Sequence, residues 1–140
     1  MVDKQSRLKT ANLIQDFKHG VITNDEFVAG FPRSNDAAIG AIRSVLWFCY
    51  DDLREHRLTG KWALTVEGEK LFDRCILFLK TDLEYHGPAN LASIPMALER
   101  LRRWLTRNSE PVITPWWPFR NQELMLHSER LISDSASPNT

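Results

Sequence analysis

The chain has 140 residues, which suits one domain and allows a hydrophobic core without stabilising disulfides or metals. Eighteen basic side chains balance eighteen acidic ones, so no net charge steers the molecule toward nucleic acid or an anionic membrane. Apolar runs stay shorter than the ~18 residues of a membrane span, and the N-terminal segment lacks the apolar core of a signal peptide, which together predict a cytoplasmic protein.

The first part of the chain predicts one long and one short helix. Apolar side chains beginning with Leu8 recur at gaps of three and four, which indicates an amphipathic helix over residues 4–18. Thr23 and Glu26 have the spacing of a capping box, in which each side chain binds the backbone N–H of the other residue. A short second helix is therefore expected from this box to the proline that follows.

Two longer helices are expected at the centre of the fold, over about residues 36–56 and 66–85. Ser34 or Asn35 is the expected N-cap of the first helix, and Thr65 that of the second. Both helices carry apolar residues on more than one face, including the two cysteines, which predicts that most sides are covered and the thiols reduced. Six side chains are expected to pack between these helices, namely Leu46, Cys49, Leu53, Phe72, Ile76 and Leu79.

The last part of the chain predicts two further helices, over about residues 93–107 and 121–132. Between them, residues 108–119 contain three prolines and a run of aromatic residues, which indicates an irregular strap. Residues 133–140 are small and polar and are expected to be a disordered tail. The predicted fold class is all-α: one domain over residues 1–132, a bundle of five or six helices with two central buried helices and an aromatic C-terminal strap.

Two segments thirty residues apart share the pattern F-x-x-x-D-L-x-x-H. Each places an aspartate four residues before a histidine, a pair that suits zinc, iron or manganese. The pairs are Asp52 with His56 and Asp82 with His86. Consecutive helices joined by a short loop run antiparallel, so the pairs are expected at opposite ends of the bundle. We expect no metal and no other cofactor, and keep a metal-dependent enzyme built on these four residues as an alternative.

Acidic side chains crowd the expected last turns of both central helices, where the helix dipole disfavours them. The acids are Asp51, Asp52, Glu55, Asp82 and Glu84. Arginines could pair with them across the bundle, or the acids could form an exposed surface for a basic partner. The arginines share the helix expected over residues 93–107 and are Arg100, Arg102, Arg103 and Arg107. With Trp104 beside them they also suggest a nucleic-acid-binding regulator, against which the balanced net charge argues.

The densest aromatic cluster is Trp116, Trp117 and Phe119. Large aromatic residues are enriched where binding energy concentrates in protein interfaces, although a strap that fills a groove in its own fold is the other interpretation. The chain has no G-x-S-x-G elbow, no glycine-rich phosphate loop and no H-E-x-x-H motif, which disfavours an enzyme without excluding one.

The expected function is therefore that of a small helical protein-binding module, for example of the immunity or antitoxin type. Its partner is expected to be a protein rather than nucleic acid or membrane, bound through the acidic helix ends and exposed aromatic residues. The candidate binding residues are Asp51, Asp52, Glu55, Asp82, Glu84, Trp116, Trp117 and Phe119, and no catalytic residue is assigned.

Several segments resemble small uncharacterised bacterial proteins. The likeness is found over residues 62–88 and again at 117–119, and the residues that carry it are 50–56, 58–61 and 75–85. It spans most of residues 10–120. The resemblance implies a small, stand-alone bacterial protein and brings no activity or site residue with it.

Overall fold

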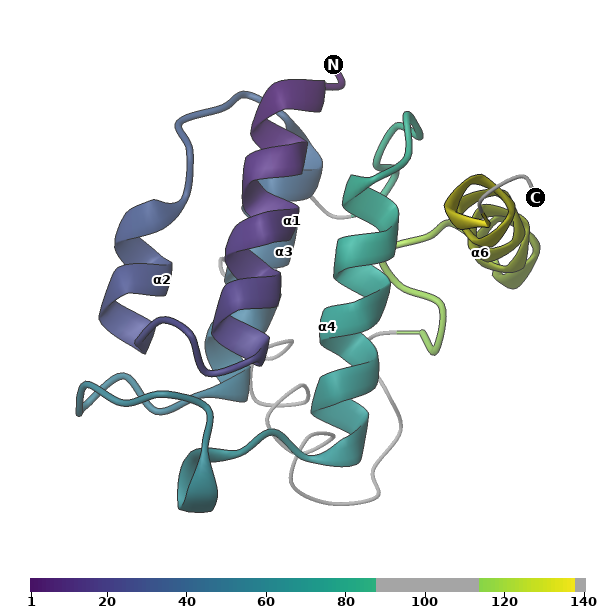
Figure 1. The fold of residues 1–140 in the computed structure, drawn as a ribbon. Helices are drawn as coiled ribbons and strands as arrows, with labels where there is room; N and C mark the ends of the chain where they lie inside the picture. The colour runs from purple at the N-terminus through teal and green to yellow at the C-terminus, as the bar shows by residue number, and fades with distance from the viewer. Residues whose placement is uncertain (88–113, 138–140) are drawn as a thin grey trace.

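The computed structural model describes residues 1–87 and 114–137, and within these ranges the chain is all-helical (Figure 1). It forms five α-helices and two short 3₁₀ turns there, and no strand, which confirms the predicted fold class. The helices are α1 (Lys4–Lys18), α2 (Asn24–Gly30), α3 (Ala37–Leu46), α4 (Val66–Leu79) and α6 (Gln122–Ala136), with 3₁₀ turns η1 (Trp47–Cys49) and η2 (Gly60–Trp62). The helix expected over 93–107 lies outside the described residues.

The long helix and the short helix at the start of the chain form as predicted. Asp3 caps α1 by accepting a hydrogen bond from the Ser6 backbone N–H, and the capping box of Thr23 and Glu26 is complete at the start of α2. The buried face of α1 differs from the apolar stripe of the sequence, because Leu8 is exposed. That face is made by Arg7, Thr10, Ala11, Ile14 and Phe17.

The prediction for α3 was wrong at both ends. Asp36, rather than Ser34 or Asn35, is the N-cap and accepts from the Ala38 backbone N–H. The helix ends at Leu46 instead of continuing to residue 56, and an irregular loop follows η1. As a result Leu53 is 87% exposed and does not pack in the core.

The other five predicted core positions belong to the fold's main hydrophobic cluster. Leu46, Phe72, Ile76 and Leu79 are buried in it and Cys49 packs against it. Helix α4 is capped by Thr65 as predicted, but it ends at Leu79, several residues early. There the Thr81 backbone N–H and hydroxyl both donate to the Phe78 carbonyl, which turns the chain out of the helix.

Helix α1 lies between α2 and α4 in front of α3, and α6 lies beyond α4 (Figure 1). Aromatic rings join these layers: Phe17 of α1 stacks on Phe27 of α2 at 4.3 Å between centroids, and it also approaches Phe72 of α4. Tyr50, from the start of the loop, meets both Phe17 and Phe27 edge-on. The loop after α3 is therefore anchored at its first residue in the same aromatic core.

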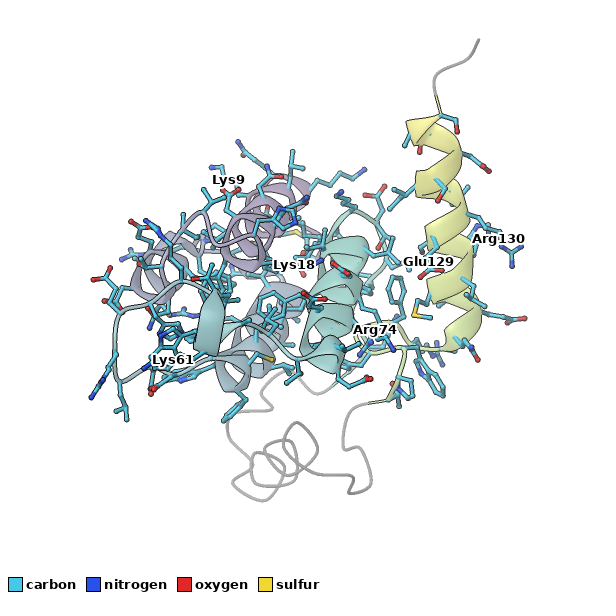
Figure 2. All side chains as sticks on the ribbon, turned by 60° about the horizontal axis from the view of Figure 1, so that its bottom comes forward. Lys9, Lys18, Lys61, Arg74, Glu129 and Arg130 are labelled. Carbon is cyan, nitrogen blue, oxygen red and sulfur yellow. The ribbon has the colours of Figure 1, made fainter. Side chains whose placement is uncertain are left out.

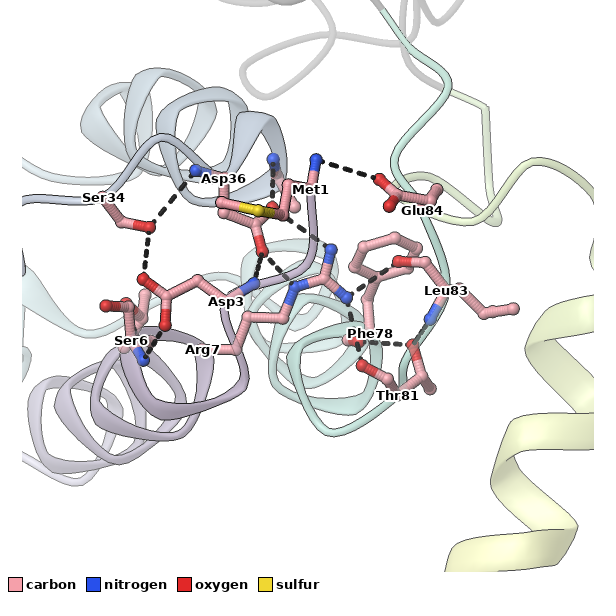
Figure 3. A network of polar contacts seen from close by, with 12 residues as sticks. Met1, Asp3, Ser6, Arg7, Ser34, Asp36, Phe78, Thr81, Leu83 and Glu84 are labelled. Atoms are coloured by element: carbon pink, nitrogen blue, oxygen red, sulfur yellow. Dashed lines mark hydrogen bonds and ion pairs between the residues drawn. The ribbon is translucent and has the colours of Figure 1, made fainter.

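A buried ion pair joins the N-terminal ends of α1 and α3 (Figure 3). Arg7 is almost completely buried, and its Nε and Nη2 donate to the two carboxylate oxygens of Asp36 at 2.6 and 3.2 Å. Its Nη1 donates to the carbonyls of Thr81 and Leu83 at 3.0 and 2.8 Å, and Phe78 lies against the guanidinium. One side chain thus connects α1, α3 and the segment that follows α4.

The C-terminal strap lies against the bundle before α6 begins. Trp117 and Phe119 are buried, the peptide bond between Trp117 and Pro118 is cis, and the Trp117 Nε1–H donates to the Tyr85 hydroxyl at 3.2 Å. Asn121 caps α6, which continues to Ala136, so residues 133–136 are helical rather than part of a disordered tail. Among the described residues no helix is both long and apolar enough to cross a membrane.

Candidate partner-binding surface

The structure separates the five candidate acids into two groups at opposite ends of the bundle (Figure 1). Asp51, Asp52 and Glu55 lie in the loop after η1, on the side of α2. Asp82 and Glu84 lie in the segment after α4, near the N-terminus of the chain. None of the five is in a helix, so the expected conflict with helix dipoles does not arise.

Among residues 1–87 and 114–137, the group after α4 is paired with amines rather than with arginine. The Lys4 ammonium donates to Asp82 at 2.8 Å, and the N-terminal amine lies 3.4 Å from Glu84. Both pairs are exposed, so each contributes little to stability. The arginines of the 93–107 segment lie outside the described residues, and so does any pairing with them.

Among the described residues, the acids of the group after η1 accept hydrogen bonds but form no ion pair. Asp51 accepts from the Leu53 backbone N–H at 2.7 Å, Asp52 from the Trp47 indole N–H at 3.3 Å, and Glu55 from the Thr23 hydroxyl at 2.9 Å. None of these three acids has an ion-pair partner within the part of the chain that the structure describes.

Two large apolar side chains stand among these acids. Leu53 is 87% exposed and Trp47 is 52% exposed, and the Trp47 indole is held by its hydrogen bond to Asp52. Single exposed apolar residues are common, but here two of them lie in one short segment with three acids that have no ion-pair partner among the described residues. We call residues 47–55 the acidic loop.

The acidic loop is fixed by the first residue of α2 rather than by its own hydrogen bonds. Asn24 is buried, and its Nδ2 donates to the carbonyls of Asp51 and Arg54, both at 3.1 Å. Its Oδ1 accepts from the His56 backbone N–H at 2.8 Å, while its own backbone N–H donates to the His56 carbonyl. Sequence reasoning missed Asn24, because within a capping box it reads only as a helix residue.

His56 closes the loop as a structural residue. Its ring is buried and stacks on Trp62 at 4.3 Å between centroids, and its Nδ1 donates to the Arg54 carbonyl at 2.7 Å. Since a carbonyl only accepts, the proton sits on Nδ1 and Nε2 has no partner among the described residues. The ring therefore supports the loop from inside.

The candidate aromatic residues lie elsewhere. Trp117 and Phe119 are buried, which supports the strap interpretation for both, and Trp116 is half-buried against the smaller hydrophobic cluster around Phe78. The strap lies between α4 and α6, on the other side of the molecule from the acidic loop (Figure 1). The acids of the acidic loop and these aromatic residues therefore do not form one surface.

The predicted metal ligands are not brought together. Neither Asp52 and His56 nor Asp82 and His86 share a helix, and the two pairs lie at opposite ends of the bundle (Figure 1). In residues 1–87 and 114–137 no three side chains of histidine, cysteine, aspartate or glutamate are grouped as metal ligands. Burial raises the pKa of Cys49 to about 12, and it raises that of Cys75 too, so both thiols stay protonated and non-nucleophilic at neutral pH.

The chain matches no family model, and no curated protein or solved structure is significantly similar to it. What the described residues define is an all-helical protein with a fixed, exposed loop of acidic and apolar side chains.

Proposed function

We propose that this protein is a protein-binding module and that the acidic loop is the centre of its binding surface. The observation that carries the proposal is the exposure of Leu53 within a loop whose backbone is fixed by Asn24. A flexible loop would lose conformational entropy on binding, whereas a fixed one presents its side chains at little further cost. Covering a leucine of this kind contributes about 1.5–3 kcal/mol.

The charges around Leu53 define the kind of partner that fits. Asp51, Asp52 and Glu55 lie within two residues of Leu53 along the loop, and they favour a basic surface with an apolar recess for Leu53 and Trp47. Acids at the rim of such a contact increase the association rate and exclude acidic competitors. A small immunity or antitoxin protein that covers a basic toxin is one type of molecule with this requirement.

The proposal includes a cytoplasmic location. Both cysteines are free thiols, one buried and one packed against the core, as is usual in a reducing compartment. Asp82, Glu84 and Trp116 would belong to a different surface, because they lie at the other end or side of the bundle.

Site-specific photocrosslinking tests the proposal directly. A photoreactive residue replaces Leu53 in the full-length protein, and a matched control carries it at Leu8, an exposed position on α1. In cells of the native host we expect a discrete protein adduct from position 53 that is absent from position 8. The captured protein is then purified, and its affinity should fall on Leu53→Asp and on Asp52→Asn/Glu55→Gln.

Two results would count against the acidic loop. The first is the same set of adducts from both positions, which would indicate random collisions. The second is a captured protein whose affinity is unchanged by Leu53→Asp, with circular dichroism showing that the variant is folded.

A further inference from the structure

A cleft of about 330 Å³ is lined by residues of α4, α6 and the strap between them. These two helices lie on the side of the molecule away from the acidic loop (Figure 1). Its volume falls at the lower end of the range for small-molecule sites, roughly 300–1,000 Å³. The lining residues are Lys70, Asp73, Arg74 and Leu77 of α4, Pro115 of the strap, and Met125 and Glu129 of α6. The cleft thus combines an apolar surface with side chains of both charges.

Arg74 is the unusual residue of this cleft. It is half-buried, and its Nε donates to the Trp117 carbonyl at 3.0 Å, which fixes the plane of the guanidinium. Burial lowers the pKa of Arg74, and the charge of the nearby Glu67 offsets this effect only in part. No described carboxylate lies within ion-pair distance, and the other guanidinium N–H groups have no partner among the described residues.

The facing wall carries the opposite charge. Glu129 lies on the α6 side of the cleft and Arg74 on the α4 side (Figure 2), and Glu129 too lacks an ion-pair partner among the described residues. The other two charged residues are occupied, since Asp73 binds Lys18 at 2.6 Å and Lys70 lies 3.6 Å from Glu67. The unpaired charges are therefore one cation and one anion on opposite walls.

We propose that this cleft binds a small zwitterion with an apolar body, of the size of an apolar amino acid or dipeptide. The ligand's carboxylate accepts from the free N–H groups of Arg74, whose planar fork matches a carboxylate. Its ammonium group lies toward Glu129, and its apolar part covers Leu77, Met125 and Pro115. A simple anion would pair with Arg74 but leave Glu129 without a partner, and a simple cation would pair with Glu129 but leave Arg74 without one. Only a molecule with both charges matches both walls.

Titration of the full-length protein with L-leucine and L-leucyl-L-leucine, followed by NMR, tests this site. Saturable shifts are expected at the Met125 methyl group and at the Arg74 Nε–H. Leucinamide, which lacks the carboxylate, and N-acetyl-leucine, which lacks the ammonium group, should each bind at least about tenfold more weakly. Arg74→Gln and Glu129→Gln should each weaken binding of the zwitterions by a similar factor, whereas Lys9→Gln on the exposed face of α1 should not.

Glu129 is exposed, so Glu129→Gln remains informative even if loss of the Trp117 contact unfolds Arg74→Gln. The proposal is overturned if neither zwitterion shifts these resonances up to its solubility limit. Equal affinity for leucine and both blocked analogues would also overturn it, as would affinity unchanged by Glu129→Gln. The cleft and the acidic loop are separate, so either site can fail its test without deciding the other.

Discussion

A guanidinium without access to water needs a fixed counter-charge, and Arg7 has one in Asp36. The pair is bidentate, and two backbone carbonyls occupy a third nitrogen of Arg7. Such a pair adds less stability than its short distance suggests, because both charges lost their hydration when the protein folded. Its larger effect appears when one partner is removed and the other stays buried.

The first prediction is that Asp36→Ala lowers the free energy of unfolding by about 3–5 kcal/mol, the range for breaking a buried ion pair. The variant leaves Arg7 buried and also removes the N-cap of α3. Urea denaturation followed by circular dichroism measures the loss. The double variant Arg7→Met/Asp36→Ala removes the buried charge and should recover part of the stability; a double variant less stable than Asp36→Ala would contradict this account.

The second prediction concerns the stability of the protein at low pH. Burial alone would raise the pKa of Asp36, but hydrogen bonds from Arg7 and from the backbone N–H groups of Asp3 and Ala38 outweigh burial and hold the pKa below its ordinary value of 3.8. A carboxyl with a lowered pKa in the folded state stabilises the protein above the unfolded-state pKa and loses that contribution as the pH falls through the folded-state pKa. The free energy of unfolding should therefore fall below about pH 4, and more gently in Arg7→Met.

Urea denaturation at a series of pH values measures both slopes. Asp3, whose pKa is lowered by hydrogen bonds from Ser6 and Ser34, adds a contribution of the same sign in both proteins. Identical acid slopes in the wild type and Arg7→Met would show that Arg7 does not set the pKa of Asp36.

At the scale of elements, the position at which α3 ends determines whether the residues near it are buried or exposed. Leu46 is the last residue of the helix and is fully buried, whereas Leu53 lies seven residues later in the loop and is open to solvent. On a continuous helix two residues seven apart would share a face. Their different fates follow from the helix ending between them.

The third prediction uses this contrast. Leu46→Ala should cost about 2–5 kcal/mol, as large core truncations do, whereas Leu53→Ala should change the free energy of unfolding by less than about 0.5 kcal/mol. Chemical denaturation of the two variants side by side measures the difference. Comparable losses in both would mean that residue 53 packs in the core after all.

The starts of α2 and α4 could be predicted better than the ends of α3 and α4. Thr23 and Thr65 act as caps as their local sequences indicate, because a cap depends on residues three positions away. The course of the loop after η1 depends on Asn24, which binds it from 27 and 30 residues away in the sequence, and no local pattern records these contacts. Asp51, Asp52 and Glu55 were therefore expected on a helix, although they lie in a loop.

The fourth prediction tests the support of the acidic loop. Asn24→Ala leaves the carbonyls of Asp51 and Arg54 and the N–H of His56 without their partner. Only the His56 hydrogen bond is fully buried, so the expected cost is about 1–3 kcal/mol, the range for one buried group left unsatisfied. Hydrogen exchange at the His56 amide should become faster than in the wild type. Asn24→Asp keeps the acceptor for His56 but loses both donors to the carbonyls of Asp51 and Arg54. The His56 amide should therefore be better protected from exchange in Asn24→Asp than in Asn24→Ala.

At the scale of the whole molecule, the strap joins the two hydrophobic clusters. Trp117 belongs to the main cluster, and Phe119 belongs to the smaller one with Phe78 and Ala38. The strap also holds Arg74 and Tyr85 by hydrogen bonds. Its burial, rather than any exposed aromatic surface, explains why this stretch contains two tryptophans and a phenylalanine in four residues.

The fifth prediction is that Trp117→Ala lowers the free energy of unfolding by about 3–5 kcal/mol, the range for removing a buried large aromatic side chain. Trp116→Ala should cost clearly less, because Trp116 is only half-buried. Thermal and urea denaturation of both variants provide the comparison. A larger loss from Trp116 than from Trp117 would contradict the placement of the strap.

The contacts of Asn24 also bear on the order in which the chain acquires structure. They join positions 27–32 residues apart and fix a segment that forms no regular helix of its own. Such contacts require closure of a long stretch of chain before they are gained, so the acidic loop should take its shape only after α2 has docked. A synthetic peptide of residues 47–55 should therefore not reproduce the surface, and an early folding intermediate should not present it to a partner.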